Sequence, residues 1–398
     1  MGKTIDIDVE YLTRVEGHGN IVVNTKNGEI EKCELQIVEA PRFFEGMLQG
    51  RSIFEAQHIT SRICGICACG HSLASISAAE DAIDFTPSLQ TKILRKLLMH
   101  IEILDSHILH IYLLAAPDLL GVKSFIPLIK THNDVVRRAL RMKKTCNDIC
   151  DILVGRHVHP ISSIVGGWTK LPSEKNLDDM LAMLLLLEKD LTATVELAST
   201  LTFPEFGRET EYIALVNNNG EYPFLEGDIG STDGLKVKKK DYKTVTNEFV
   251  VPHSSGKHTK ASRESYMVGA LARLNLNHNR LHPNAKKIAK AIGLKPICVN
   301  PFLNTAAQLI ECAHCLEDSI NIITHFKNKG VNHDEAIIVG LNENKTIKIK
   351  KGKGVGAVEV PRGLLFHEYE INEKGKIINA NCIIPTGQNL NNIEHDMR

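Results

Sequence analysis

The sequence predicts an α+β fold in which α-helix predominates. Short strand-like runs, in which apolar and polar residues alternate, occupy residues 5–39. Several later segments carry apolar residues at three- and four-residue steps, the period of an α-helix with one buried face. No low-complexity or flexible linker separates these parts. We therefore expect a single large unit, with an N-terminal antiparallel β-meander at about residues 1–40, a core of long helices at about residues 50–330 and a C-terminal strand and loop region at about residues 335–398.

The composition is that of a globular protein without net charge. The 398 residues are 43% hydrophobic, and 47 Lys and Arg balance 47 Asp and Glu, so nothing indicates binding to nucleic acid or to an acidic membrane surface. No apolar run follows Lys3, and none reaches about 18 residues, so we expect neither a signal peptide nor a membrane span. Without export signals, the 10 cysteines should stay reduced in the cytoplasm, as metal ligands or core residues.

The β-meander is predicted from three strand-like runs at residues 5–9, 19–23 and 31–38, with a turn at residues 26–28. Between the first two runs, residues 13–19 read Thr-Arg-Val-Glu-Gly-His-Gly. The central Glu16 is either a solvated turn acid or a buried carboxylate whose raised pKa suits a proton relay.

Four long helices are predicted in the core. Thr86-Pro87 opens the first, whose apolar positions continue to Ala116-Pro117-Asp118. The others are expected at residues 134–153, 174–201 and 304–327. The segment 174–201 is apolar on all sides, which predicts a central, buried helix. Near the C-terminus, residues 350–356 are rich in Lys and Gly, and we expect a basic loop there.

The residues best suited to bind a metal lie at positions 62–71, which read Arg-Ile-Cys-Gly-Ile-Cys-Ala-Cys-Gly-His. Two thiols three positions apart can converge on one metal ion, and Gly65 permits the turn between them. Arg62 favours the thiolate form, a soft ligand for zinc, copper, nickel or iron. Taken alone, the pair also fits a redox dithiol or half of a zinc site. A second such pair, Cys312 and Cys315, lies in the predicted helix 304–327 and is interpreted as part of that helix.

The wider pattern, Arg-x-Cys-Gly-x-Cys-x-x-x-His, resembles the first metal-binding motif of nickel–iron hydrogenase large subunits. The resemblance implies that family's fold, with an N-terminal antiparallel sheet and a central bundle of long helices. It implies reversible heterolytic cleavage of dihydrogen at a nickel–iron centre whose iron carries cyanide and carbonyl ligands. Cys64 would be a terminal nickel ligand, Cys67 would bridge nickel and iron, and Glu16 would be the first proton acceptor.

Further segments extend the resemblance along the chain. Residues 354–363 resemble the segment that carries an arginine over the metal site, here Pro361-Arg362, and Asp118 matches the acid that pairs with this arginine. Residues 379–386 resemble the segment whose Thr386 donates a hydrogen bond to an iron-bound cyanide. Glu45 and the backbone carbonyl of Cys382 would bind magnesium or another divalent ion, since hard oxygen ligands suit such ions.

One motif of the family is absent from these 398 residues: the Asp-Pro-Cys-x-x-Cys-x-x-His segment that supplies two more thiolates. The local sequence resembles the F420-non-reducing, viologen-reducing hydrogenases of methanogens, in some of which a small separate peptide, with Cys or selenocysteine, carries this motif. The resemblance implies that peptide as a partner, an iron–sulfur small subunit that holds the clusters, and further electron-transfer subunits such as a heterodisulfide reductase. The alternatives are a metal-free scaffold subunit of an electron-transfer complex and an incomplete copy of the enzyme.

Overall fold

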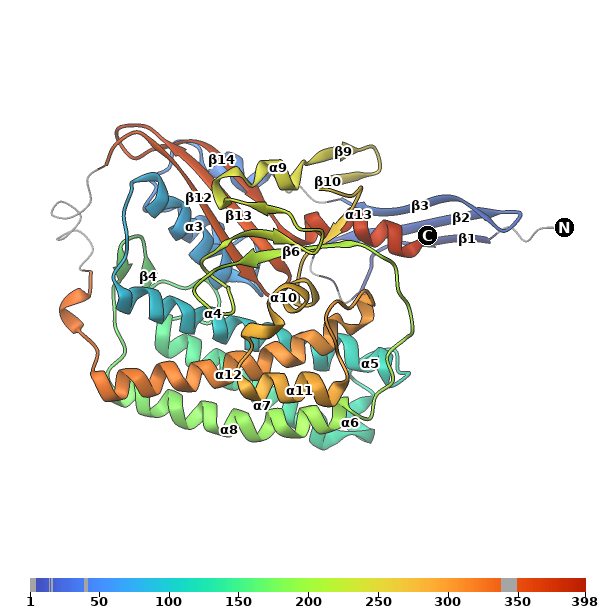
Figure 1. Cartoon of the computed structure of the whole chain (residues 1–398), viewed down its shortest axis with the longest axis horizontal. Coiled ribbons are helices and arrows are strands. Elements are labelled where there is room, and N and C mark those ends of the chain that lie inside the picture. Colours follow the sequence, from blue (N-terminus) through green and yellow to red (C-terminus); the bar gives the residue numbers. More distant parts are fainter. Residues whose placement is uncertain (1–4, 14, 16, 39–41, 338–348) are drawn as a thin grey trace.

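The computed structural model describes residues 5–13, 15, 17–38, 42–337 and 349–398. Figure 1 shows a bundle of long helices along one side of the molecule and β-sheets along the other, with the N-terminal sheet extending outward from one end. Helix is more abundant than strand in these residues, so the predicted α+β class with predominant helix is confirmed. The division into domains stays a prediction.

The helices form the bundle and cover the sheets. They are α1 (Phe43–Leu48), α2 (Ala56–Thr60), α3 (Ala68–Ala82), α4 (Leu89–Leu109), the π-helix η1 (His110–Ala115), α5 (Ala116–Leu119), α6 (Leu128–Thr131), α7 (Asn133–Val154), α8 (Glu174–Ala198), α9 (Lys243–Thr246), α10 (Ala270–Asn277), α11 (Pro283–Ile292), α12 (Asn304–Lys329) and α13 (Pro385–Met397). Short 3₁₀ turns are η2 (Lys239–Asp241), η3 (His278–Arg280), η4 (Pro301–Leu303) and η5 (His333–Glu335).

The strands form several small sheets rather than one large sheet. They are β1 (Ile5–Val9), β2 (Gly19–Lys26), β3 (Glu29–Ile37), β4 (Ser163–Ile164), β5 (Gly167–Trp168), β6 (Glu211–Val216), β7 (Asp228–Ser231), β8 (Lys236–Val237), β9 (Phe249–Val251), β10 (Ser254–His258), β11 (Tyr266–Met267), β12 (Gly352–Val360), β13 (Gly363–Ile371) and β14 (Ile377–Ile383). The sheet β12-β13-β14 is antiparallel throughout, and the sheet β11-β6-β7-β8 includes one parallel pair.

The N-terminal meander β1-β2-β3 has the strand order and antiparallel pairing that the sequence predicts. The burial of its first strand differs from the expectation raised by its alternating pattern. Ile5, Ile7 and Val9 are 44%, 45% and 40% exposed. The sheet extends away from the body, so no second layer covers this edge strand among the described residues (Figure 1).

The first long helix is interrupted by a wider turn. Ser88 caps its N-terminus by accepting a hydrogen bond from the Thr91 N–H, and α4 then runs into η1 and α5. Pro117 has no N–H to offer to the preceding turn, which favours a local change of helix geometry there. The run Leu89–Leu119 is long and apolar enough to cross a membrane by composition, but 72% of its most apolar window is buried inside the molecule, as expected of a core helix.

Helix α8 corrects the prediction of a central, fully buried helix. It buries only one face, through residues such as Leu177, Leu184 and Leu191, whereas Leu185 and Leu186 are 45% and 49% exposed. In Figure 1 it lies at the outer edge of the bundle. The continuous leucine run hid the three- and four-residue period of its buried face, because apolar residues also occupy the outer face.

The C-terminal region departs from the expected strands and loops in two places. The predicted basic loop at residues 350–356 is largely strand β12, and residues 385–397, which were expected in a loop region, form helix α13. The glycines of β12 are needed for packing: a Cβ at Gly352, Gly354 or Gly356 would lie inside 3.0 Å of the backbone of α3. On α3 the facing residues include Ala74, Ala78 and Ala82, one turn apart. This glycine–alanine seam sets α3 directly on β12.

Candidate functional site

Cys64 and Cys67 lie together at the N-terminus of α3. Cys67 is the residue that precedes the first turn of the helix, and its backbone N–H donates to Cys64 Sγ over 3.0 Å. Both residues are half-buried, and their Cα atoms are 5.5 Å apart. The structure joins the two sulfurs as a disulfide, which differs from the expectation that every cysteine is reduced. The same three-residue spacing that brings two thiolates to one metal also brings them to each other.

The N-terminus of α3 rests on a buried acid that lies outside every motif recognised in the sequence. The backbone N–H of Gly70 donates to both carboxylate oxygens of Glu102 at 2.9 Å. Burial raises the pKa of Glu102 to about 8, although hydrogen bonds from Gly70 and Cys69 oppose this rise. The sequence carried one signal for this acid: Glu102 is a charged residue within the largely apolar run Leu-Leu-Met-His-Ile-Glu-Ile-Leu. His71, which closes the cysteine motif, is also buried and pairs with His367 of β13 at 3.1 Å.

The turn between β12 and β13 carries Pro361 and Arg362 to the same end of α3. A Cβ at Gly70, in the first turn of α3, would clash with Val360, the last residue of β12. Arg362 follows two residues later, and its Nη1 donates to Ser106 Oγ of α4 at 3.1 Å. The packing of α3 on β12 therefore brings Cys67 and the Pro361–Arg362 turn to one region of the molecule.

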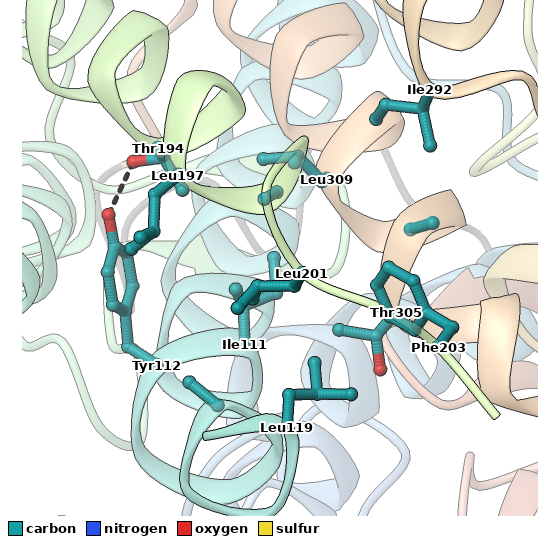
Figure 2. Close-up of a pocket in the computed structure, with 13 residues that line it drawn as sticks. Ile111, Tyr112, Leu119, Thr194, Leu197, Leu201, Phe203, Ile292, Thr305 and Leu309 are labelled. Carbon is teal, nitrogen blue, oxygen red and sulfur yellow. Dashed lines mark hydrogen bonds between the residues drawn. The ribbon is translucent and has the colours of Figure 1, made fainter.

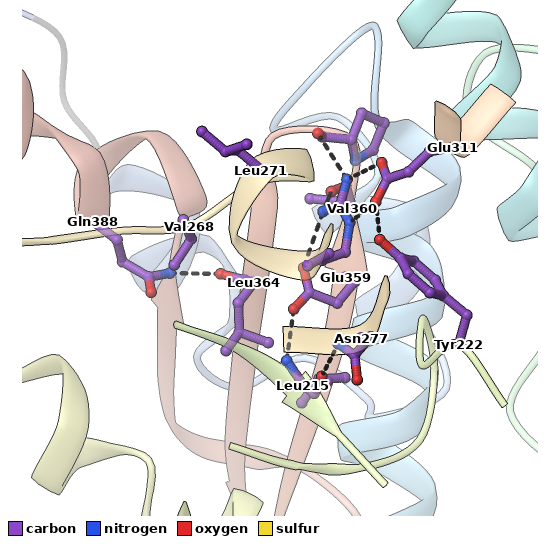
Figure 3. Close-up of polar contacts among 12 residues, drawn as sticks. Leu215, Tyr222, Val268, Leu271, Asn277, Glu311, Glu359, Val360, Leu364 and Gln388 are labelled. Atoms are coloured by element: carbon purple, nitrogen blue, oxygen red, sulfur yellow. Dashed lines mark hydrogen bonds and ion pairs between the residues drawn. The ribbon is translucent and has the colours of Figure 1, made fainter. Parts of the chain in front are cut away.

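A buried ionic network, drawn in Figure 3, hydrogen-bonds to the backbone at the start of this turn. The Arg273 guanidinium donates to both oxygens of Glu311 at 2.7 Å and to Glu359 Oε2 at 3.0 Å. It also donates to the carbonyl oxygens of Val360 at 2.9 Å and Pro361 at 3.4 Å. Arg273, Glu311 and Glu359 have no exposed surface, so each charge depends on the others for compensation.

The pKa values of the two acids in the network are shifted in opposite directions. Burial alone would raise the pKa of Glu311, but the charge and hydrogen bonds of Arg273, with a further bond to His107 at 2.8 Å, hold the pKa of this acid well below its usual range. Burial raises the pKa of Glu359 to about 7 against the opposing effect of Arg273. Neither acid was identified as a buried charge from the sequence, since Arg273 lies 38 residues from Glu311 and 86 residues from Glu359.

Helix α4 and its continuation form one wall beside Arg362. Burial, the largest effect, and the nearby Arg362 charge together lower the pKa of His110 to about 4. Burial also lowers the pKa of His107, against the opposing effect of its bond to Glu311. Asp118 lies beyond η1 in α5 and is exposed. Its predicted pairing with Arg362 stays a prediction, since the hydrogen bond described for Arg362 goes to Ser106.

Glu45 and Cys382, predicted to share a divalent ion, lie side by side. The Cys382 backbone N–H donates to Glu45 Oε1 at 2.9 Å, and Arg42 Nε donates to Glu45 Oε2 at 2.8 Å. Thr386 is exposed in the first turn of α13, four residues beyond Cys382. Glu16 lies outside the described residues, so its predicted place beside the cysteines is untested.

The remaining described thiols lie elsewhere. Cys69 hydrogen-bonds to Cys150 of α7, which contributes most to the raised pKa of Cys69. Cys312 and Cys315 are completely buried in α12, and burial raises the pKa of both thiols. These residues behave as core side chains, in agreement with the interpretation made from the sequence.

A mainly apolar pocket lies between η1, α5, α8 and α12, as Figure 2 shows. Its walls include Ile111, Leu119, Leu201 and Leu309. At one edge of the pocket the Tyr112 hydroxyl bonds to Thr194. The lining contains no charged side chain, so the pocket suits a small apolar molecule.

Comparison with known proteins identifies what this arrangement resembles. The family described as nickel-dependent hydrogenase matches residues 42–135 and 235–396, and a HoxL-like family matches residues 6–40. The alpha chain of sulfhydrogenase 1 from Pyrococcus furiosus is 31% identical over 99% of this chain and 90% of its own length. A chain of the F420-non-reducing hydrogenase vhu from Methanocaldococcus jannaschii is 30% identical over 99% of this chain and 97% of its own length.

Solved structures of hydrogenases have the same fold as this chain. An NAD+-reducing [NiFe]-hydrogenase in the H2-reduced state superposes with a TM-score of 0.84 at 24% identity, over 98% of this chain and 91% of that chain. A Ni-Fe-Se hydrogenase from D. vulgaris Hildenborough superposes with a TM-score of 0.77 at 21% identity, over 98% and 91%. At these identities the likeness shows a common architecture.

Proposed function

This chain belongs to the nickel-dependent hydrogenases as a large subunit, an oxidoreductase acting on H2, and from that membership we propose that Cys64 and Cys67 bind its nickel–iron centre. The observation that carries the proposal is the convergence of both sulfurs at the N-terminus of α3, whose first turn packs on Val360, the residue before Pro361. When bound, the centre supplies the reversible heterolytic cleavage of dihydrogen.

The chemistry of the donors fits this centre. Thiolates are soft ligands that suit nickel and iron. The N-terminus of a helix favours negative charge, and the Cys67 N–H donates to Cys64 Sγ, so in the reduced pair both features stabilise thiolate over thiol. The half-buried position gives a metal access to the sulfurs while the body of α3 holds them in place.

The surrounding residues orient substrate and ligands and carry protons. Arg362 and Asp118 would shape the open side of the site, with Pro361 fixing the approach of the arginine. The Thr386 hydroxyl would donate a hydrogen bond to a cyanide ligand of the iron. Glu16 would accept the proton released from dihydrogen and pass it outward, as its resemblance to the family motif implies. The apolar pocket between η1 and α12 suits a molecule as small and apolar as dihydrogen.

The Glu45–Cys382 contact supports a divalent ion beside this centre. A buried carboxylate held against the backbone of β14 offers oxygen ligands of the kind that magnesium prefers. Arg42 now supplies the positive charge at Glu45, and its side chain is 61% exposed, so it can withdraw when an ion binds.

The large subunit works with partners that complete the site and carry electrons away. Two thiolates cannot enclose nickel, and the nearby or paired thiols Cys69, Cys312 and Cys315 are buried in the core, so we infer that two more ligands come from outside the described residues. We propose a small Cys- or selenocysteine-bearing peptide as their source. Electrons would leave through an iron–sulfur small subunit, and from there to a heterodisulfide reductase. The exposed strand β1 is one apolar surface suited to a partner.

The direct test measures metal content and turnover in the natively purified complex. Cys64→Ser and Cys67→Ser should each abolish hydrogen–deuterium exchange and lower bound nickel, since an alkoxide replaces a soft thiolate poorly. Cys298→Ser is the matched control, because Cys298 is also half-buried but lies in another segment, where its backbone N–H donates to Asn275 Oδ1. Normal nickel content and exchange in both site variants would refute the proposed ligands. A wild-type complex with neither nickel nor exchange would favour the metal-free scaffold function.

A further inference from the structure

A second cluster of metal-ligating side chains lies away from the cysteines. His253, in the turn between β9 and β10, His258, at the end of β10, and Glu394, on α13, each present one ligand atom, and these atoms lie within 4.8 Å of one another. Two of the three residues are buried, and the side chain of His253 is only 18% exposed. Among the described residues this is the one group of three or more such donors that meets so closely.

Three separate elements hold the cluster together. Ser254 Oγ of β10 accepts the backbone N–H of Ile37 in β3 at 3.3 Å, and Ser255 Oγ donates to the Ile37 carbonyl at 2.9 Å. Glu394 Oε1 accepts the N–H of Leu35, also in β3, at 2.9 Å. The hairpin, the N-terminal sheet and the C-terminal helix therefore converge on Glu394, although they are remote in sequence.

Hydrogen bonds within the cluster leave one buried donor atom unused. His253 Nε2 lies 2.7 Å from Glu394 Oε1, a normal hydrogen bond. His258 Nε2 lies 3.9 Å from the same oxygen, which is too long for one, and it has no hydrogen-bond partner within the described part of the chain. His258 is 1% exposed, so this nitrogen is also hidden from solvent. A buried polar atom without a partner is costly and calls for a ligand.

The spacing of the donor atoms fits a bound ion. Bonds of about 2.0–2.2 Å in a tetrahedral arrangement place neighbouring ligand atoms about 3.3 Å apart. The observed separations of 2.7 and 3.9 Å bracket this distance, so a small shift of the Glu394 carboxylate satisfies both. Burial, the largest effect, lowers the pKa of His258, which keeps the ring in the neutral form that binds metals. Asn391 hydrogen-bonds the same ring and orients it.

We propose that His253, His258 and Glu394 bind a zinc-class divalent ion that is separate from the nickel–iron centre. Two imidazoles and a carboxylate are a typical zinc donor set, and the partial exposure of His253 leaves room for a water molecule as the fourth ligand. Its role is structural. Glu394 lies eight residues after Thr386 on α13, so the ion ties the helix that carries Thr386 to β3 and to the β9–β10 hairpin.

The test uses the intact, natively purified complex, in the wild type and in variants. The wild type should contain about one zinc-class ion for each large subunit, and X-ray absorption at the zinc edge should show imidazole and oxygen neighbours at about 2.0–2.2 Å. His258→Ala and Glu394→Gln should lower this zinc content at least about tenfold. Their nickel content reports separately on the Cys64–Cys67 site.

Matched control variants distinguish a specific loss of the ion from a general loss of structure. Glu211 is also a buried acid that accepts backbone N–H groups, from Ser262 and Arg263, but no histidine is among the hydrogen-bond partners described for it. Glu211→Gln and Glu45→Gln should both retain the zinc. If a site variant fails to fold, the wild-type absorption spectrum decides alone. Absence of a stoichiometric ion from the wild type, sulfur-only neighbours in its spectrum, or full zinc retention in both site variants would overturn the proposal.

Discussion

Glu102 is a buried acid whose burial and hydrogen bonds have opposite effects on its charge. It lies beneath the first turn of α3, where Gly70 donates to both of its oxygens, yet burial raises its pKa to about 8. The folded protein therefore holds a proton on this side chain at neutral pH, when the unfolded chain has released it. The contribution of Glu102 to stability is complete below its ordinary pKa and is lost as the pH rises toward 8.

Glu102→Gln should flatten this pH dependence, because the amide imitates the protonated acid at every pH. Between pH 6.5 and 8 the wild type should lose about 2 kcal/mol from this residue, since one pH unit corresponds to about 1.36 kcal/mol. Thermal unfolding at pH 6.5 and 8.5 measures the difference in Tm for each protein. Asp148→Asn, an exposed acid on α7, is the control that should leave the difference unchanged. An equal difference in wild type and Glu102→Gln would contradict the assignment.

Arg273 is the residue on which the position of the Pro361–Arg362 turn depends most. Its five N–H donors reach two acids and two backbone carbonyls, a geometry that lysine does not reproduce.

Arg273→Lys should lower stability by about 3 kcal/mol and reduce hydrogen–deuterium exchange more than nickel content, because the cysteines are untouched while Arg362 loses its support. Arg137→Lys, on the surface of α7, should change neither. Unaltered exchange in Arg273→Lys would mean that the turn is held by other contacts.

At the scale of whole elements, the seam between α3 and β12 decides how closely the cysteines approach the arginine turn. A methyl group at Gly356 would enter the backbone of Ala74 and Ala78, and neither backbone can move independently of its helix. Gly356→Ala should therefore push α3 away from β12, at a cost of about 1–3 kcal/mol, and lower both nickel content and exchange. Gly46→Ala, where a Cβ meets no atom within 4 Å, should have no such effect. Metal analysis and Tm of the two variants provide the comparison.

The same seam explains where the sequence was informative about elements and where it was not. Long helices with apolar residues at three- and four-residue steps were predictable: the predicted helices 134–153 and 304–327 match α7 and α12 closely. In β12, the alternate glycines suggested a loop. They are needed because the backbone of α3 packs against them, and α3 lies nearly 300 residues earlier in the chain. The buried charges Glu102, Arg273 and Glu359 escaped notice for the same cause, since their partners are remote in sequence.

At the scale of the whole molecule, the motif residues 62–71 and 361–362 gave the family and the two cysteines, but not the interior that holds them. A local motif can specify which atoms bind a metal. It cannot specify the distance between Cys67 and Arg362, which depends on the packing of α3, α4 and β12 in three dimensions.

The large subunit expressed alone should bind little nickel, because Cys64 and Cys67 supply only two thiolates. If the proposed peptide completes the site, mass spectrometry of the native complex should find a polypeptide with a Cys-x-x-Cys or selenocysteine-bearing segment. Active, nickel-loaded protein with no such segment would overturn the prediction. If the segment lies on the same polypeptide, the proposal of a separate peptide is wrong, but the proposal that further ligands complete the site stands.

Along Gly352, Gly354 and Gly356 the contact between α3 and β12 is made of backbone, glycine and alanine, and none of these groups has a rotamer to change. Pressure or cooling usually closes small gaps in a protein because side chains change rotamer, but the residues of this contact have no rotamer to change. The spacing between the sulfur-bearing turn and the arginine turn should therefore be among the least compressible distances in the molecule, and it should stay constant even where the surrounding helices, packed through long leucine side chains, shift with conditions.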